Sequence, residues 1–157
     1  MTESRIDEEI AEHPRFARYL HALEQVVDTD EADLVAAVLR DQDATMADSA
    51  VGRHLDRRAT QLLTGPAFVT WARTMAAPIG ERDYLSRRLR EWRLLRSIAL
   101  GEAWTAEELI GATDWCQRTA TNTPLISTPA AVRLLADHGR TRRIRNAARL
   151  RLRQLEQ

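Results

Sequence analysis

The sequence contains no lysine: all 23 of its basic residues are arginine. No lysine is therefore present to form a Schiff base or to complete a phosphate-binding P-loop. A single cysteine, Cys116, cannot form an internal disulfide or a zinc site built on several thiolates. No apolar run approaches the roughly 18 residues of a membrane-spanning helix, and the acidic start MTESRIDEEI does not resemble a signal peptide. These absences predict a cytoplasmic protein without a membrane partner.

Acidic and basic residues are equal in number, 23 of each, so the formal net charge is zero. Their distribution along the chain is uneven. Residues 1–48, the acidic segment, carry 13 carboxylates and 4 arginines, whereas residues 49–157, the arginine-rich remainder, carry 10 carboxylates and 19 arginines. These opposite charges favour an attraction between the two segments, either inside one molecule or between two copies.

Apolar residues recur at a helical spacing along nearly the whole sequence, and the alternation typical of strands is absent. The breaks are short and contain Gly, Pro, Thr and Asp, which are turn and cap residues. A chain of 157 residues with 44% hydrophobic composition is long enough to bury one core. We therefore predict an all-α fold, a compact single-domain bundle of roughly seven to nine helices with short connections, in which residues 1–157 form one domain.

Cap and break residues predict where the helices begin. The strongest local pattern is a capping box, in which Thr105 is followed three residues later by Glu108. The helix that it begins is expected to reach about Ala120. The other helices are expected to begin near Ser4, Pro14, Asp30, Thr45, Pro66, Glu81, Pro129 and Thr141.

The last predicted helix, about Thr141 to Leu155, has one apolar and one basic face. A row of guanidinium groups runs along the basic face for about 16 Å and can bind phosphates or acidic side chains. An exposed face that is solvated or paired within the molecule is the ordinary alternative. The residues of this candidate partner or polyanion site are spaced three, four and four apart: Arg142, Arg145, Arg149 and Arg153.

Residues 129–149 also have the order of a helix-turn-helix: a short helix, a turn with Gly139 and a basic helix. Arg145 stands six residues after Gly139, where such a motif usually buries an apolar side chain. The fit is therefore poor, and tight sequence-specific DNA binding is not expected.

Four further residues are interface candidates. Arg88 and Arg96 fall in the same sector as the apolar face of the long helix that begins near Glu81. They reach the edge of the core, pair with acids inside it, or meet another chain. Trp71 and Trp115 are two of four tryptophans in a chain with only two Phe and two Tyr. Tryptophan fills cores and also anchors interfaces, so a core position is the default for both.

Residue types that commonly carry catalysis are not grouped in the sequence. No two of the four histidines stand three or four residues apart, and a glycine-rich phosphate loop and a serine elbow are absent. We predict no catalytic residue, no metal and no cofactor, and expect Cys116 to be buried. An enzyme is disfavoured but stays open, because a helical bundle can assemble a site from residues that are distant in sequence.

The preferred function is a non-enzymatic protein-interaction module, a small helical adaptor or regulatory subunit. Its partner is expected to be a protein, with a second copy of this chain among the candidates. The alternative is a nucleic-acid-binding regulator that uses the C-terminal arginine-rich helix.

Overall fold

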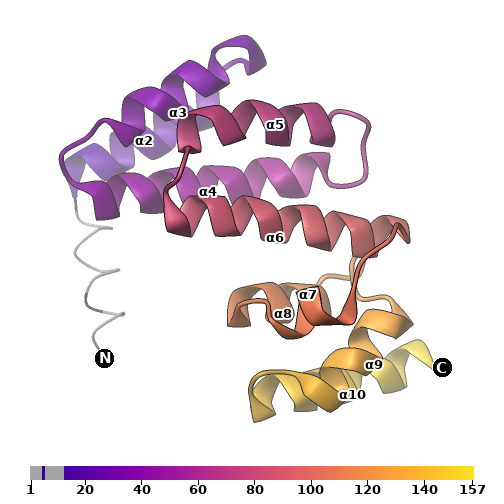
Figure 1. The fold of residues 1–157 in the computed structure, drawn as a ribbon. Coiled ribbons are helices and arrows are strands. Elements are labelled where there is room, and N and C mark those ends of the chain that lie inside the picture. The colour runs from indigo at the N-terminus through magenta and orange to yellow at the C-terminus, as the bar shows by residue number, and fades with distance from the viewer. Residues whose placement is uncertain (1–4, 6–12) are drawn as a thin grey trace. The chain divides into compact units, whose positions relative to one another are not determined.

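A computed structural model describes residue 5 and residues 13–157 of the chain (Figure 1). In these residues the chain forms nine α-helices, α2 to α10, and one short 3₁₀ helix, η1, and it contains no β-strand. The predicted all-α class and the predicted number of helices are thus confirmed. The expected helix start near Ser4 lies outside the described residues. No helix in the described part of the chain combines the length and apolar character that crossing a membrane requires.

The chain divides into two compact units, Met1–Leu89 and Arg90–Gln157, and the division falls within α6. Whether residues 1–157 behave as the single predicted domain stays a prediction. The N-terminal unit contains α2 (Pro14–Gln25), η1 (Asp28–Asp30), α3 (Glu31–Leu39), α4 (Ala44–Leu62), α5 (Phe68–Ile79) and the first part of α6 (Asp83–Leu100). The C-terminal unit contains the rest of α6, α7 (Ala106–Ile110), α8 (Asp114–Asn122), α9 (Pro129–His138) and α10 (Arg142–Leu155).

In the N-terminal unit, α3 packs against α4 and α5, and α2 packs against α4. Apolar residues at helical spacing form its core, as the sequence pattern predicts. The most deeply buried large side chains of this unit are Leu23, Met46, Leu55, Phe68, Met75 and Leu85.

Three predicted helix starts in this unit shift by one or two residues; one of them is that of α6, which begins at Asp83 rather than near Glu81. The carboxylate of Asp43 accepts a hydrogen bond from the Met46 N–H at 3.1 Å, so α4 begins at Ala44 rather than at Thr45. A turn contains Pro66, and α5 begins two residues later at Phe68. Local cap residues compete at such short distances, and the structure selects one of them.

In the C-terminal unit, α10 packs on both α8 and α9, and α9 lies beside α10 in Figure 1. Gly139 ends α9 and is followed closely by α10. A Cβ atom on Gly139 would lie 2.7 Å from Cγ2 of Ile144 and 2.7 Å from the carbonyl oxygen of Leu135. Glycine is therefore required where these two helices meet.

The predicted capping box is present at the start of α7. The Thr105 hydroxyl accepts from the Glu108 N–H at 3.2 Å, and the Glu108 carboxylate accepts from the Thr105 N–H at 3.0 Å. The prediction that this helix reaches Ala120 is wrong, because α7 ends at Ile110 and α8 begins only at Asp114.

Two buried polar side chains account for the break between α7 and α8. Glu91 is 7% exposed and accepts from the N–H of Thr113 at 2.8 Å and from its hydroxyl at 2.7 Å. Gln117 is fully buried and donates to the carbonyls of Leu109 and Ile110 at 2.9 and 3.0 Å. These contacts satisfy backbone groups at the end of one helix and the start of the next, which makes two helices more favourable than one.

The Thr105 capping box gives a stability prediction. Thr105→Ala should lower the free energy of unfolding by about 1 kcal/mol, because the Glu108 N–H loses its acceptor. Both residues are exposed, so the substitution leaves no cavity. Denaturant unfolding followed by circular dichroism measures the change.

Thr45→Ala is the matched control for this experiment. Thr45 is exposed in the first turn of α4, whose cap is Asp43, so its replacement should change stability little. Equal unfolding curves for wild type and Thr105→Ala would contradict a stabilising capping box at the start of α7.

Candidate functional site

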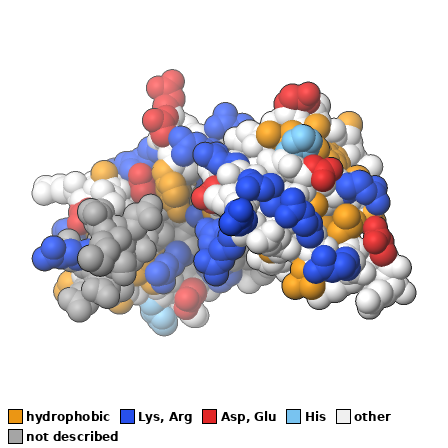
Figure 2. Space-filling view, turned by 90° about the horizontal axis from the view of Figure 1, so that it is seen from below, with side chains coloured by type: hydrophobic (Ala, Val, Ile, Leu, Met, Phe, Trp, Pro, Cys, Tyr) orange, Lys and Arg blue, Asp and Glu red, His pale blue; other side chains and the backbone are white. Residues whose placement is uncertain are grey.

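The helix α10 gives the C-terminal unit a strongly basic surface. Between Arg142 and Leu155 it carries six arginines and no acidic residue. None of the six forms an ion pair with a carboxylate of residues 13–157. Figure 2 shows how much of one face of the molecule consists of arginine side chains.

The predicted arginine row divides into an exposed part and a tethered part. Arg142, Arg149 and Arg153 are exposed. Arg145 is half-buried, and its Nη1 donates to the carbonyl of Gly139 at 2.8 Å, a contact that closes the turn before α10. Three of the four predicted arginines are thus exposed, whereas Arg145 supports the fold, and the binding of a partner by the row stays a prediction.

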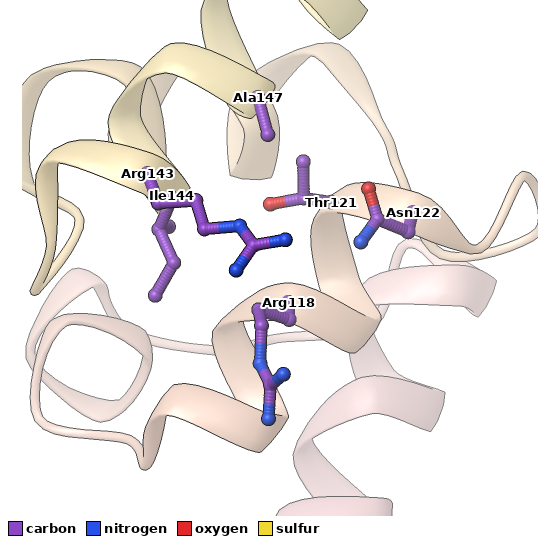
Figure 3. Close-up of a pocket in the computed structure, with 6 residues that line it drawn as sticks. All are labelled: Arg118, Thr121, Asn122, Arg143, Ile144 and Ala147. Atoms are coloured by element: carbon purple, nitrogen blue, oxygen red, sulfur yellow. The ribbon is translucent and has the colours of Figure 1, made fainter.

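A pocket of about 180 Å³ lies between α8 and α10 (Figure 3). It opens on another side of α10 from the arginine row: at 100° per residue, Arg143 lies about 80–120° around the helix from Arg142, Arg149 and Arg153. The lining residues are Arg118, Thr121 and Asn122 from α8 and Arg143, Ile144 and Ala147 from α10.

The side chains that line this pocket are mostly polar, and two of them are basic. In Figure 3, Arg143 extends across the pocket toward Thr121 and Asn122. Within residues 13–157, no hydrogen bond or ion pair engages the guanidinium of Arg143, which leaves all its N–H groups for a ligand. Arg118 uses only its Nε, which donates to a backbone carbonyl of its own helix at 3.4 Å. In Figure 3 the guanidinium of Arg118 points away from Arg143, so Arg143 is the guanidinium directed into the pocket. Guanidinium N–H donors can bind carboxylate or phosphate oxygens.

The hydroxyl of Thr121 cannot donate to such an anion, because it already donates to the Gln117 carbonyl at 2.9 Å. The Asn122 side chain is exposed at the rim and offers an amide donor. The pocket therefore combines positive charge with few competing acceptors.

Two exposed leucines continue this surface beyond the pocket. Leu150 is 52% exposed and lies seven residues after Arg143, which places it on nearly the same side of α10. Leu125 is 64% exposed and follows Asn122, the last residue of α8, by three positions. We call the six pocket residues together with Leu125 and Leu150 the α8–α10 surface.

A side-chain contact ties the chain after α8 to α10. The Nε of Arg151 donates to the hydroxyl of Ser127 at 3.2 Å, and Ser127 is itself buried. The connection that carries Leu125 is thereby held near the helix that carries Leu150. Sequence analysis missed this surface, since Arg118 and Arg143 are 25 residues apart and only the packing of α8 on α10 brings them together.

The predicted interface arginines Arg88 and Arg96 are mostly covered. Their side chains are 13% and 14% exposed and form ion pairs, Arg88 with Asp56 at 3.4 Å and Arg96 with Glu102 at 3.9 Å. Both side chains thus pair with an acid, but Glu102 is itself 56% exposed, so the pair of Arg96 lies at the surface rather than inside the core. Their role in an interface stays a prediction.

The tryptophans lie in or near the cores of their units. Trp71 is 6% exposed and Trp115 is half-buried, in edge-on contact with Trp92 at 5.3 Å between ring centroids. Cys116 is fully buried, as predicted. An interface role for Trp71 and Trp115 stays a prediction.

A second polar cluster, in the N-terminal unit, has no counterpart in the sequence analysis. Glu31 is 3% exposed, and its Oε2 accepts from Nε2 of His54 at 2.6 Å, Nε1 of Trp71 at 2.9 Å and Nε of Arg58 at 3.2 Å. The Nδ1 of His54 faces Nη2 of Arg57 at 2.8 Å, so a neutral ring with its proton on Nε2 satisfies both contacts. Both ring nitrogens are engaged within the protein.

Burial raises the pKa of Glu31, but the hydrogen bonds from His54, Trp71 and Arg58 outweigh it and lower the pKa to about 2. The carboxylate thus stays ionised and links α3 to α4 and α5. Among the described residues, no group of three or more His, Cys, Asp or Glu side chains is arranged to hold a metal ion.

Comparison with known proteins supplies no relative: no protein-family model, no curated protein and no solved structure matches this chain. The site must therefore be judged on its own geometry and chemistry.

The lowered pKa of Glu31 predicts a pH-dependent stability. A carboxyl group that titrates at 4.5 when unfolded and at about 2 when folded stabilises the protein above pH 4.5, and this contribution is lost as the pH falls toward 2. At about 1.4 kcal/mol per pKa unit, the contribution is on the order of 3 kcal/mol. Glu31→Gln should lower the free energy of unfolding by this order at neutral pH, and its deficit relative to wild type should shrink as the pH falls through this window.

Denaturant titrations across that pH range measure both effects. Asp33→Asn, an exposed substitution in the first turn of the same helix, is the control and should cost less than about 1 kcal/mol. A deficit of Glu31→Gln that is equal at all pH values would contradict the lowered pKa.

Proposed function

We propose that this chain is a non-enzymatic protein-interaction module that docks a partner protein on the C-terminal unit. One observation carries the proposal: exposed arginines without acidic partners among residues 13–157 occur on the same helix as an exposed leucine. A protein partner offers both kinds of contact, carboxylates for the arginines and apolar side chains for the leucine.

The leucines favour a protein over a nucleic acid. Burying an exposed apolar side chain contributes about 1.5–3 kcal/mol, a gain that a phosphate backbone cannot supply. Leu125 and Leu150 expose more than half of their surface, and Leu150 lies on nearly the same side of α10 as Arg143, which lines the pocket. Arginine also suits carboxylates, since its planar guanidinium can donate two parallel hydrogen bonds to one.

The size of the pocket supports the same function. Sites for small molecules usually measure about 300–1,000 Å³, whereas this pocket measures about 180 Å³. Such a space suits one inserted side chain of a partner better than a substrate or cofactor.

A nucleic-acid-binding regulator is the second candidate, and the exposed row favours it. Arg142, Arg149 and Arg153 are exposed along about 16 Å of α10. A row of this length can contact several phosphates of a nucleic-acid backbone.

The double variant Arg142→Gln/Arg149→Gln separates the two functions. For a protein module, the tagged wild-type chain retains a partner protein from native lysate after nuclease treatment, and the double variant retains less. For a nucleic-acid binder, log affinity falls with log salt by about 0.9 per phosphate contacted, and the double variant flattens that slope by about two.

Arg93→Gln/Arg133→Gln is the matched control, because it removes the same charge from exposed positions outside α10. We expect the control to behave as wild type in both assays. Release of every captured protein by nuclease, together with a steep salt dependence on duplex, would contradict the protein-interaction function and support the second candidate.

A further inference from the structure

We infer that the α8–α10 surface binds an acidic amphipathic helix of the partner protein. A carboxylate of that helix is held by Arg143, and an apolar side chain two turns away packs on Leu150. This inference rests on the proposed function and specifies the chemistry of the partner.

The positive charge of the pocket favours a carboxylate of the partner as the group that binds there. Its six lining residues include two guanidinium groups and no acidic side chain. Neither Arg118 nor Arg143 is neutralised by an ion pair: Asp114, the acid nearest to Arg118 along α8, pairs instead with Arg140 at 3.4 Å. A carboxylate that enters the pocket gains charge-assisted hydrogen bonds without displacing an existing acid.

The spacing of Arg143 and Leu150 along α10 favours a helical segment of the partner. Arg143 and Leu150 are seven residues apart, so they stand about 10 Å apart along the helix axis. A partner helix that runs along α10 presents a carboxylate and an apolar side chain at the same interval when they are also seven residues apart. Recognition of a helix in a groove commonly uses anchors at such i and i+7 positions.

The surface between these two anchors lets a helix approach. Ala147 lines the pocket between Arg143 and Leu150, and its side chain is only a methyl group. α8 and α10 form the two walls, and in Figure 3 the side chain of Ala147 points from α10 toward Thr121 of α8.

Two synthetic peptides of equal composition test this inference on the full chain. Each has about 18 residues, enough for an alanine-rich helix to form, with one glutamate and one leucine on a neutral background. In the matched peptide leucine follows glutamate by seven residues, which places both on one face of the helix. In the shifted peptide it follows by five, which places it about 140° around the helix from glutamate. Fluorescence anisotropy measures the affinity of each peptide.

We expect the matched peptide to bind more tightly than the shifted peptide. Arg143→Gln and Leu150→Gln should each weaken the matched peptide by about tenfold, whereas Arg133→Gln, an exposed change on α9, should not. Replacing the peptide glutamate by glutamine should reduce binding to wild type but not to Arg143→Gln, which identifies the paired groups. Arg143 and Leu150 are exposed, so circular dichroism and melting of these variants should match wild type.

Three results would overturn the inference. Equal affinity for both peptides would exclude the helical spacing, and displacement of the matched peptide by a short nucleic-acid duplex at physiological salt would make a nucleic acid the occupant. A wild-type dimer that Leu150→Gln dissociates would make a second copy the occupant.

Failure of the inference can be distinguished from failure of the proposed function. If neither peptide binds while the wild-type chain still retains a protein partner from nuclease-treated lysate, only the helical occupant is wrong. If no protein is retained either, the protein-interaction function itself fails.

Discussion

The C-terminal unit depends on one buried amide. Gln117 is fully buried, donates to two carbonyls at the end of α7, and accepts from the N–H of Arg140 at 2.9 Å in the turn between α9 and α10. An unsatisfied buried polar group costs about 1–3 kcal/mol, so the side chain fixes three segments at once. Because Gln117 belongs to α8, it holds that helix in the position from which Arg118 and Thr121 face α10. The α8–α10 surface is therefore built on a polar contact of the core.

The N-terminal unit uses a charged group for the same purpose. Glu31 receives donors from α4 and α5, and its charge is balanced by Arg58. A buried ion pair contributes little net stability when it is complete, but it is costly to break, because the remaining charge stays buried. In both units a buried polar side chain thus specifies which helices meet, while the burial of apolar residues supplies most of the favourable free energy of folding.

Local patterns in the sequence predicted the helices well, whereas long-range contacts were inaccessible to it. The box of Thr105 and the glycine at Gly139 act within a few residues, so the sequence displays both. The break after α7 depends on Gln117 and on the distant Glu91, and a helical pattern alone runs straight through it. Helical spacing likewise predicted that the arginines of the row share one side of α10. Nothing in the sequence indicated that Arg145 donates a hydrogen bond to a backbone carbonyl.

The uneven distribution of charge along the sequence corresponds to different ion pairing in the two units. Acids of the acidic segment pair with arginines of the remainder inside the N-terminal unit: Glu31 with Arg58 at 3.2 Å and Asp48 with Arg82 at 2.7 Å. Part of the predicted attraction between the two segments is thus realised within one molecule. The C-terminal unit, by contrast, holds 12 arginines against 7 acidic residues, and the arginines of α10 have no acidic partner among residues 13–157. Unpaired like charges on one helix repel each other. An acidic ligand on this surface would reduce that electrostatic repulsion.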